Sequence, residues 1–169
     1  MADELGALYL RDALERFQAY KKLGDRAISQ VYDGGLAWTP GPESNSIAVL
    51  VKHLAGNMRS RWTSFLTTDG EKPDRDRDAE FQVAPDVSRE QVLEWWADGW
   101  ARLFETLTGL APADLTRTVI IKGQPHSVLA AINIQLAHYA YHVGQIVQLA
   151  RHLAGPAWKS LSVPRRPTA

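Results

Sequence analysis

The stretch Gly123-Gln-Pro-His-Ser-Val-Leu-Ala-Ala-Ile-Asn-Ile-Gln-Leu-Ala-His-Tyr-Ala-Tyr-His-Val-Gly-Gln-Ile-Val-Gln-Leu-Ala150 decides the fold class, because its 28 residues include no Asp, Glu, Lys or Arg. A membrane-spanning helix needs about 20 mostly apolar residues, so the length alone would allow a span. Eight of these residues are Asn, Gln or His, however, and each would carry a polar group into hydrocarbon. The stretch therefore predicts a buried helix of a soluble protein and no membrane span.

The composition excludes several classes of site and partner. The 169 residues include 19 Lys plus Arg and 19 Asp plus Glu, so we expect no broad affinity for nucleic acid or anionic membranes. The chain contains no cysteine, which excludes disulfides, thiol nucleophiles and thiolate metal ligands. A metal ion held by side chains must therefore use His, Asp, Glu or weaker ligands.

The length and the two ends predict the domain organisation and the location. At about 100–200 residues per domain, we expect a single domain over residues 1–160 and a C-terminal tail at residues 161–169. Asp3 and Glu4 precede any apolar run, so the N-terminus does not resemble a secretory signal. Without a signal or a cysteine, a cytoplasmic location is expected.

The hydrophobic pattern predicts an all-α protein with four long helices. We expect these helices at residues 3–33, 46–66, 88–110 and 127–154. Ser88 and Ser127 are the expected N-caps of the last two helices, and Ser46 is one of three candidates for the second. The β-branched residues at 116–121 predict a small hairpin or extended arm before the last helix. The expected fold is a four-helix bundle with this small β-hairpin-like insertion.

The connection between the second and third helices is long and rich in charge. It contains Pro73, Pro85 and the alternating run Asp74-Arg-Asp-Arg-Asp78. Such a composition predicts a solvated loop, and a substrate lid is the functional alternative. The sequence leaves the role of the segment Glu71–Glu80 open.

Two histidines of the last helix have the spacing of a metal-binding pair. His138 and His142 differ by about 40° around the helix and by about 6 Å along it, so both rings could reach one ion. Ala131 and Leu149 lie between their two directions, which indicates that the pair faces the core. A pair of core histidines bonded to neighbouring groups is the alternative. The intervening Tyr139-Ala-Tyr141 lacks the glutamate of an H-E-x-x-H zinc peptidase, so that class is disfavoured.

A third protein ligand is harder to identify from spacing. His152 lies about 15 Å along the helix axis from His142, and His126 precedes the helix. His53 remains, on a stripe of small polar residues about 130° away from the main apolar stripe of the second helix. Periodicity slightly favours a solvated surface position for His53, and a wet internal site between helices is the alternative.

The histidine segments together resemble a known superfamily. Ser44-Asn-Ser-Ile-Ala-Val-Leu-Val-Lys-His-Leu-Ala-Gly-Asn-Met58, then Trp62, and much later Gln135-Leu-Ala-His-Tyr-Ala-Tyr-His-Val-Gly-Gln-Ile146 are similar to the DinB/YfiT-like superfamily. The similarity extends from the first helix to about Gly155 and is greatest to a bacterial branch without an established substrate.

This resemblance implies an up-down-down-up four-helix bundle, often a homodimer. It also implies a metal site with one histidine from the second helix and two from the last, here His53, His138 and His142. Characterised relatives include thiol-dependent transferases and a maleylpyruvate isomerase, in which the metal binds or activates a low-molecular-weight thiol. The resemblance, and not the periodicity, places His53 in the site.

Three neutral imidazoles would leave an open position on a divalent ion, which could then act as a Lewis acid. Zinc is the favoured ion, with nickel or iron(II) as alternatives. Residues that could orient the imidazoles, or merely pack between helices, are Asn57, Gln135, Tyr141 and Gln145. Neither histidine segment contains Asp or Glu, so no general base can be named.

Two functions from different classes fit these observations. The first is a divalent-metal-binding DinB-like protein that acts as a metal-dependent hydrolase or thiol-dependent transferase on a small molecule or a low-molecular-weight thiol. The second is a non-catalytic, stress-related bundle in which the metal is incidental or structural. In either case we expect a homodimer formed through helical faces, with Trp95, Trp96 and Trp100 in the core more readily than in the interface.

Overall fold

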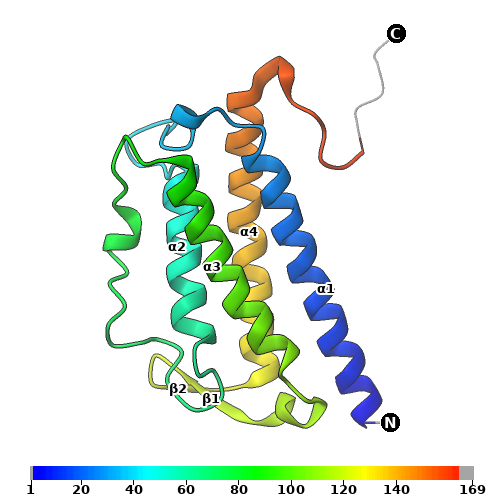
Figure 1. The fold of residues 1–169 in the computed structure, drawn as a ribbon. Coiled ribbons are helices and arrows are strands. Elements are labelled where there is room, and N and C mark those ends of the chain that lie inside the picture. Colours follow the sequence, from blue (N-terminus) through cyan, green and yellow to red (C-terminus); the bar gives the residue numbers. More distant parts are fainter. Residues whose placement is uncertain (1, 164–169) are drawn as a thin grey trace.

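The structure is a computed structural model that describes residues 2–163. Four long helices and one hairpin make up most of it (Figure 1). The elements are α1 (Ala2–Ile28), α2 (Ile47–Trp62), α3 (Arg89–Thr108), β1 (Thr118–Ile121), β2 (Gln124–Ser127) and α4 (Val128–Ala154). Short 3-10 helices occur at η1 (Asp33–Gly35), η2 (Ala79–Phe81), η3 (Pro112–Thr116) and η4 (Gly155–Ala157). The predicted all-α bundle with a small hairpin before the last helix is confirmed.

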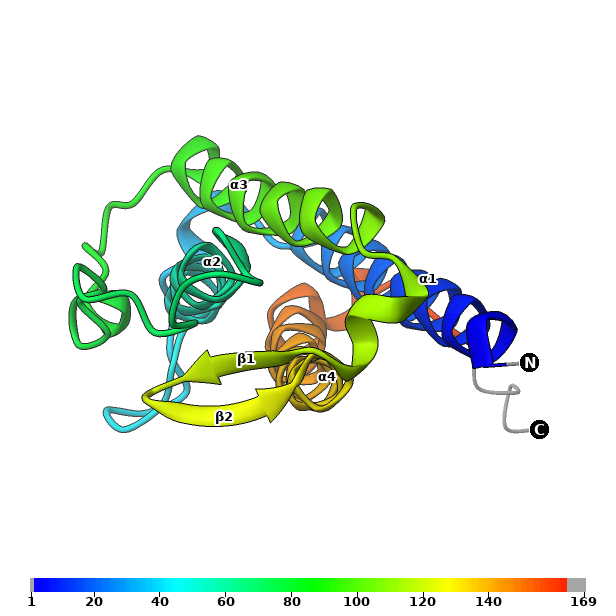
Figure 2. The ribbon, with the colours of Figure 1, turned by 90° about the horizontal axis from the view of Figure 1, so that it is seen from below.

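The helices follow the up-down-down-up order that the resemblance implies (Figure 1). α1 packs mainly on α4, and α2 packs mainly on α3. Because α2 and α3 run in the same direction, the chain must return along the full length of α2, which is about 24 Å for sixteen residues. The return takes the outer side of α2, as the view from below shows (Figure 2). This topology explains why the connection at residues 63–88 is so long.

Three serines begin the helices as their positions predict. The hydroxyl oxygens of Ser46, Ser88 and Ser127 each accept a hydrogen bond at 3.1 Å from the backbone N–H three residues later. An N-cap of this kind contributes about 1 kcal/mol to stability. Gly155 ends α4 at a φ of +52°, a conformation that side-chain-bearing residues rarely adopt.

The first two helices end earlier than the hydrophobic pattern predicts. α1 ends at Ile28 and not near residue 33, because the chain turns to bury Val31 and Leu36. The backbone carbonyl of Leu36 accepts a hydrogen bond from Ala48 N–H at the start of α2. α2 ends at Trp62 and not near residue 66, because Ser64 adopts a positive φ of 49°.

The predicted hairpin lies at the lower end of the bundle, beside the start of α4 (Figure 2). β1 and β2 are antiparallel, with Thr118 opposite Ser127, and the turn residues Lys122 and Gly123 have φ of 53° and 71°. The carboxylate of Asp69 accepts hydrogen bonds from the backbone N–H groups of both turn residues, at 2.9 and 2.7 Å. The hairpin is therefore tied to the start of the long connection after α2.

Aromatic side chains fill the centre of the bundle. Trp96 and Trp100 are 3% and 0% exposed, so they lie in the core as expected, and Trp95 is partly buried against it. The indole N–H of Trp62 donates to the hydroxyl of Tyr139 at 3.0 Å. That hydroxyl in turn donates to Oδ1 of Asn57 at 2.9 Å, whereas the indole Nε1 of the neighbouring Trp100 is buried without a hydrogen-bond partner in the described chain.

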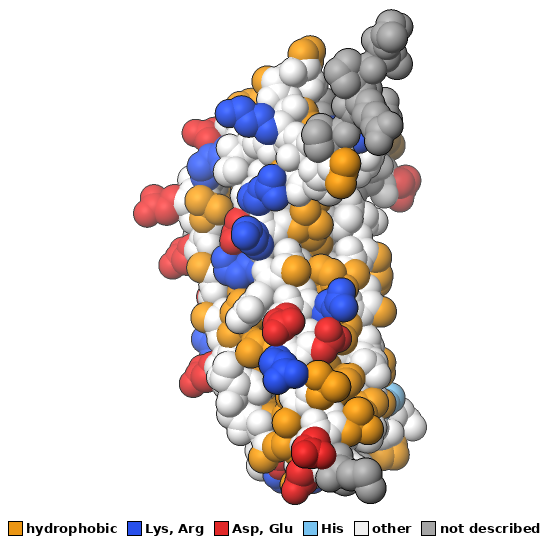
Figure 3. Space-filling model, turned by 90° about the vertical axis from the view of Figure 1, so that its right-hand side faces the viewer, with side chains coloured by type: hydrophobic (Ala, Val, Ile, Leu, Met, Phe, Trp, Pro, Cys, Tyr) orange, Lys and Arg blue, Asp and Glu red, His pale blue; other side chains and the backbone are white. Residues whose placement is uncertain are grey.

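The surface on the α1 side mixes apolar and charged side chains (Figure 3). Leu5 and Leu8 of α1 are 68% and 51% exposed there. No helix within residues 2–163 is long and apolar enough to cross a membrane. Of the expected tail, residues 164–169 lie outside the described part, while the carbonyl of Leu161 accepts a hydrogen bond from Arg26 at 2.8 Å.

Candidate metal centre

Three histidines from two helices meet between α2 and α4. His53 is on α2, and His138 and His142 are one turn apart on α4. One ring nitrogen from each lies within 4.8 Å of the others, and Nε2 of His53 is 3.4 Å from Nε2 of His138. The structure thus brings together the three residues that the resemblance implies as ligands, in a cluster that could hold a metal ion.

The solvated surface position that periodicity alone favours for His53 is wrong. His53 is 5% exposed, and twelve of the sixteen residues of α2 are buried. α2 packs on α3 with one face and contacts α4 and η2 with others, so it has more than one buried side. A single apolar stripe cannot represent a helix that is covered from several directions.

Each of the three rings has a hydrogen-bond acceptor at its Nδ1 atom. The distances are 2.8 Å from His53 Nδ1 to Glu80 Oε2, 3.2 Å from His138 Nδ1 to Gln135 Oε1, and 2.8 Å from His142 Nδ1 to Gln145 Oε1. An oxygen acceptor at Nδ1 favours the tautomer with its proton there and leaves the lone pair at Nε2. Three partners of this kind orient imidazoles as the outer shell of a metal site does.

The atom Nε2 of His142 is buried and has no hydrogen-bond partner within the described chain. Buried polar atoms almost always have a partner, so an unpaired one requires an explanation. One ring nitrogen of His142 lies within 4.8 Å of a ring nitrogen of each of the other two histidines, and a divalent ion among these nitrogens would satisfy an unpaired lone pair. The donor set therefore fits a metal.

Burial keeps two of the rings neutral. Burial, together with the neighbouring histidines, lowers the pKa of His138 to about 3 and that of His142 to about 4, although the hydrogen bond with Gln145 raises the pKa of His142. Imidazole must be neutral to bind a metal through its lone pair. Protons therefore compete weakly for these two rings near neutral pH.

The acidic partner of the cluster comes from the long connection, where the sequence did not reveal it. Glu80 is 6% exposed and binds Arg75 through both oxygens, with Nε to Oε1 at 2.7 Å and Nη2 to Oε2 at 2.8 Å. Burial is the largest influence on this carboxyl and raises its pKa, but the hydrogen bonds from His53 and Arg75 together hold the pKa below its ordinary value. Glu80 is therefore a carboxylate behind His53.

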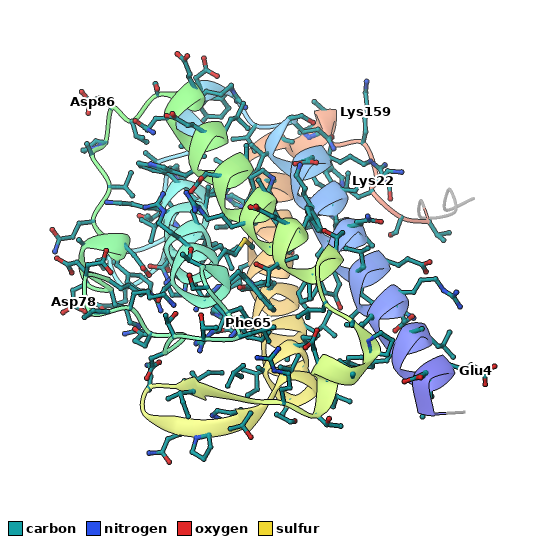
Figure 4. All side chains as sticks on the ribbon, turned by 60° about the horizontal axis from the view of Figure 1, so that its bottom comes forward. Glu4, Lys22, Phe65, Asp78, Asp86 and Lys159 are labelled. Atoms are coloured by element: carbon teal, nitrogen blue, oxygen red, sulfur yellow. The ribbon has the colours of Figure 1, made fainter. Side chains whose placement is uncertain are left out.

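The prediction that residues 67–87 form a solvated loop is wrong for the part that contains Arg75 and Glu80. The side chains of this segment gather beside α2 (Figure 4, near Asp78). Arg75 and Glu80 are buried, and Lys52 of α2 donates to the carbonyls of Ala79 and Gln82 at 2.8 Å each. Because Arg75 and Glu80 form an ion pair with each other, their charged side chains can be buried.

One signal in the sequence could have indicated the position of Glu80. Gly56 lies in the middle of α2, three residues after His53, where glycine costs about 1 kcal/mol relative to alanine. A Cβ at this position would overlap the carboxylate of Glu80. A glycine on the histidine face of a helix thus marks the close approach of another chain segment.

The other predicted site residues lie in different places. Gln135 and Gln145 contact the ring nitrogens of the histidines one turn away, whereas the side-chain oxygen of Asn57 accepts a hydrogen bond from Tyr139. Tyr141 is 55% exposed, and its ring centroid is 4.2 Å from that of His142.

The two remaining histidines are outside the cluster. His126 pairs with Val119 in the hairpin, and the ring of His152 stacks on Trp38 at 5.0 Å between centroids. Neither residue is expected to bind a metal, and the structure gives neither a place beside the other three histidines.

The cluster opens into a pocket of about 310 Å³ between α2, α4 and the long connection. Its lining contains His53, Asn57, Arg61, Glu71, Arg75, Arg77, Phe81, Lys122, Ile134, Gln135, His138, Tyr141 and His142. A pocket of this size is at the lower end of the range for small-molecule sites. The site therefore combines three candidate metal ligands with room for a small ligand.

Comparison with curated proteins finds no match to this chain. A family model described as "Protein of unknown function (DUF1572)" matches residues 4–167. The match covers all four helices and the three histidines, and the chain therefore belongs to the DUF1572 family.

Proposed function

We propose that this DUF1572 protein is a DinB/YfiT-like metal protein that binds one divalent ion through Nε2 of His53, His138 and His142. The convergence of the three Nε2 atoms, with the Nδ1 atoms bound to acceptors behind them, carries the proposal. Zinc is the favoured ion for three imidazoles, and nickel or iron(II) are alternatives.

We further propose that the protein acts on a small molecule as a metal-dependent hydrolase or a thiol-dependent transferase, within the cytoplasm. A bound divalent ion supplies a Lewis acid that lowers the pKa of a water or thiol ligand. Three protein ligands, in place of four, leave a position for such a ligand. The adjoining pocket of about 310 Å³ supports a small substrate.

Residues around the three histidines hold the imidazole rings in place. Glu80 holds the ring of His53 and makes it a stronger donor, while Gln135 and Gln145 hold the other two rings. Glu80 is not assigned as a general base, because both of its oxygens are bonded to Arg75 and one also to His53. Glu71, the one carboxylate among the pocket-lining residues, also binds Arg75.

Metal analysis of purified protein tests the ligand set. We expect about one equivalent of zinc in the wild type after loading and dialysis, and none in the variant His53→Ala/His138→Ala/His142→Ala. The double variant His126→Ala/His152→Ala is the matched control and should keep the wild-type content. Circular dichroism of each variant establishes that the bundle is folded, and equal metal in the wild type and the folded triple variant would refute the site.

A non-catalytic bundle with a structural metal is the second candidate. It is favoured by the absence of an unpaired carboxylate among the described pocket-lining residues, which leaves no general base. A screen of zinc-loaded protein against esters, amides and thiol-acceptor pairs separates the two candidates. Metal-dependent product that disappears in the triple variant supports the enzyme, and its absence across the screen supports the structural role.

A further inference from the structure

Arg61 is a buried cation without a partner in the pocket that contains the histidine cluster. It is 5% exposed, and its Nε and Nη1 atoms are buried with no hydrogen bond. Within residues 2–163, its guanidinium forms neither a hydrogen bond nor an ion pair. A Cβ at Gly70 would lie 2.6 Å from Nη1, so the guanidinium packs directly against that glycine.

The acidic side chains nearest to Arg61 are occupied elsewhere. The carboxylate of Asp69 accepts backbone hydrogen bonds from Glu71, Lys122 and Gly123 at 2.7, 2.9 and 2.7 Å. The carboxylate of Glu71 accepts from Nη1 of Arg75 at 3.0 Å. Neither carboxylate therefore bonds the guanidinium of Arg61, and their negative charges act on it only through space.

Such an arrangement is costly for a protein that has no ligand for it. An arginine stays protonated in proteins and loses its hydration on burial, so natural structures pair buried guanidinium groups. Burial lowers the pKa of Arg61 from its ordinary value, and the charges of Glu71 and Asp69 offset only part of this effect. The neighbouring Arg75, by contrast, has two carboxylate partners. A bound anion would give the guanidinium of Arg61 an ion-pair partner, as the two carboxylates do for Arg75.

We propose that Arg61 binds the carboxylate of a small-molecule substrate, which fills the pocket and reaches the three-histidine cluster with its reactive end. This inference rests on the proposed function, because it names the substrate class of the same pocket. The planar guanidinium matches a carboxylate in a bidentate manner. An anion at Arg61 would also offset the repulsion between this side chain and a metal ion at the histidines.

The charge and size of the pocket favour a carboxylate over a phosphate. A carboxylate places a single negative charge at the unpaired guanidinium, and the second carboxylate of a dicarboxylate such as malonate can reach the cations at the rim, whereas a phosphate dianion would place both of its charges at Arg61. Arg77 and Lys122 are exposed at the rim, where they would attract an anion without being buried by it. The volume of about 310 Å³ restricts the ligand to a small molecule.

Calorimetric titration tests the carboxylate site separately from the metal site. Malonate and inorganic phosphate are titrated into metal-free wild type, Arg61→Met and Arg59→Met. Arg59→Met is the matched control, because Arg59 is on the same helix but pairs with Asp98 at the surface. We expect malonate to bind the wild type and Arg59→Met, and to bind Arg61→Met at least about tenfold more weakly.

A second titration uses zinc-loaded protein with mercaptoacetate and 2-mercaptoethanol, which share the thiol and differ in the carboxylate. We expect mercaptoacetate to bind the wild type at least about tenfold more tightly than 2-mercaptoethanol, and Arg61→Met to lose this difference. Zinc content should stay at the wild-type level in Arg61→Met. If zinc does not bind at all, the proposed function fails, and the malonate titration still tests Arg61.

Thermal unfolding shows whether Arg61 instead supports the fold. Since Arg61 has no partner to lose, Arg61→Met should unfold at the same temperature as the wild type or a higher one. A large decrease in Tm, absent in Arg59→Met, would assign Arg61 a structural role and overturn the proposal. No malonate binding to wild type at millimolar concentration, malonate binding unaffected in Arg61→Met, or tighter binding of phosphate than of malonate would also overturn it.

Discussion

Replacing Glu80 by glutamine tests whether the long connection contributes to the metal site. In the wild type, the two carboxylate oxygens of Glu80 accept three hydrogen bonds, one from His53 and two from Arg75. The glutamine side chain has the same size but no charge. An amide has one oxygen and one NH₂ group. Glutamine can therefore keep the oxygen at the position shared by His53 and Arg75 only by turning its NH₂ toward Arg75 Nε, another donor.

The magnitude follows from these contacts. Loss of the carboxylate behind a ligating imidazole lowers metal affinity by about 10- to 100-fold, or about 1.4–2.8 kcal/mol. The unpaired Nε of Arg75 adds a cost in stability of about 1–3 kcal/mol, because Arg75 and Glu80 are both more than nine-tenths buried. Arg75 keeps Glu71 as its second partner, which holds the side chain in place.

Competition with a zinc-binding indicator measures the affinity, and denaturant unfolding of the metal-free protein measures the stability. Glu71→Gln is the matched control, since Glu71 binds the same arginine at 3.0 Å but contacts no histidine of the cluster. We expect Glu71→Gln to stay within about threefold of the wild-type zinc affinity. A Glu80→Gln variant that binds zinc as tightly as the wild type, or an equal loss in both variants, would refute the role assigned to Glu80.

A methyl group at Gly56 should displace the Glu80 carboxylate, so we expect Gly56→Ala to lower zinc affinity by about tenfold. Gly144→Ala, where no atom lies within 4 Å of the added Cβ, should leave zinc binding unchanged, and equal effects would contradict this. Acid should destabilise the metal-free protein, because burial lowers the pKa of His138 to about 3 and of His142 to about 4. These rings take up protons in the unfolded chain below about pH 6.5 but in the folded chain only near pH 3–4. The free energy of unfolding should therefore fall between pH 6.5 and 4 by up to about 1.4 kcal/mol per pH unit for each ring, and His142→Gln should reduce that slope in denaturant titrations. The expected homodimer should scatter light with twice the 18.8 kDa mass of the chain at micromolar concentration, and a strictly monomeric mass would exclude it.

The fold could be predicted from local features because most of its boundaries are local. Ser46, Ser88 and Ser127 cap helices through contacts only three residues long, and Gly155 stops the last helix by its own conformation. The predicted first helix is longer than the observed one, because its true end depends on the packing of Leu36 against α2, which lies further along the chain. Helix ends that tertiary contacts determine are not encoded in the pattern of one segment.

The histidine pair and its two glutamine partners could be predicted for the same reason. His138, His142, Gln135 and Gln145 are all within about three turns of one helix, so helical geometry alone brings each histidine beside its glutamine. His53 required the resemblance to a family, because its contacts with the pair cross between helices and the periodicity of α2 favoured solvent. Its burial arises from the packing of α2 against several elements, which no single period describes.

The charged groups of the long connection show why composition misjudges some loops. The run around Arg75 has alternating charges and predicts exposure, yet Arg75 is buried between two carboxylates of the same segment. The buried charges of Arg75 and Glu80 compensate each other, so this part of the segment can fold against α2 while the other charged residues of the run stay exposed. Arg61 lies on a helix and is buried with no carboxylate bonded to its guanidinium. The two arginines share one pocket but differ in that respect.

That difference bears on whether a metal at the histidines would be structural or catalytic. A structural zinc site is usually closed by four protein ligands, and the described residues bring only three histidines together. A purely structural ion would also be repelled by Arg61, and the fold gains nothing visible from keeping that cation buried and unpaired. An anionic substrate would pair with Arg61 at one end and so reduce the repulsion between Arg61 and the metal ion. Its other end could approach the open position on the metal. If malonate binding depends on Arg61, the unpaired arginine therefore supports the catalytic candidate over the structural one.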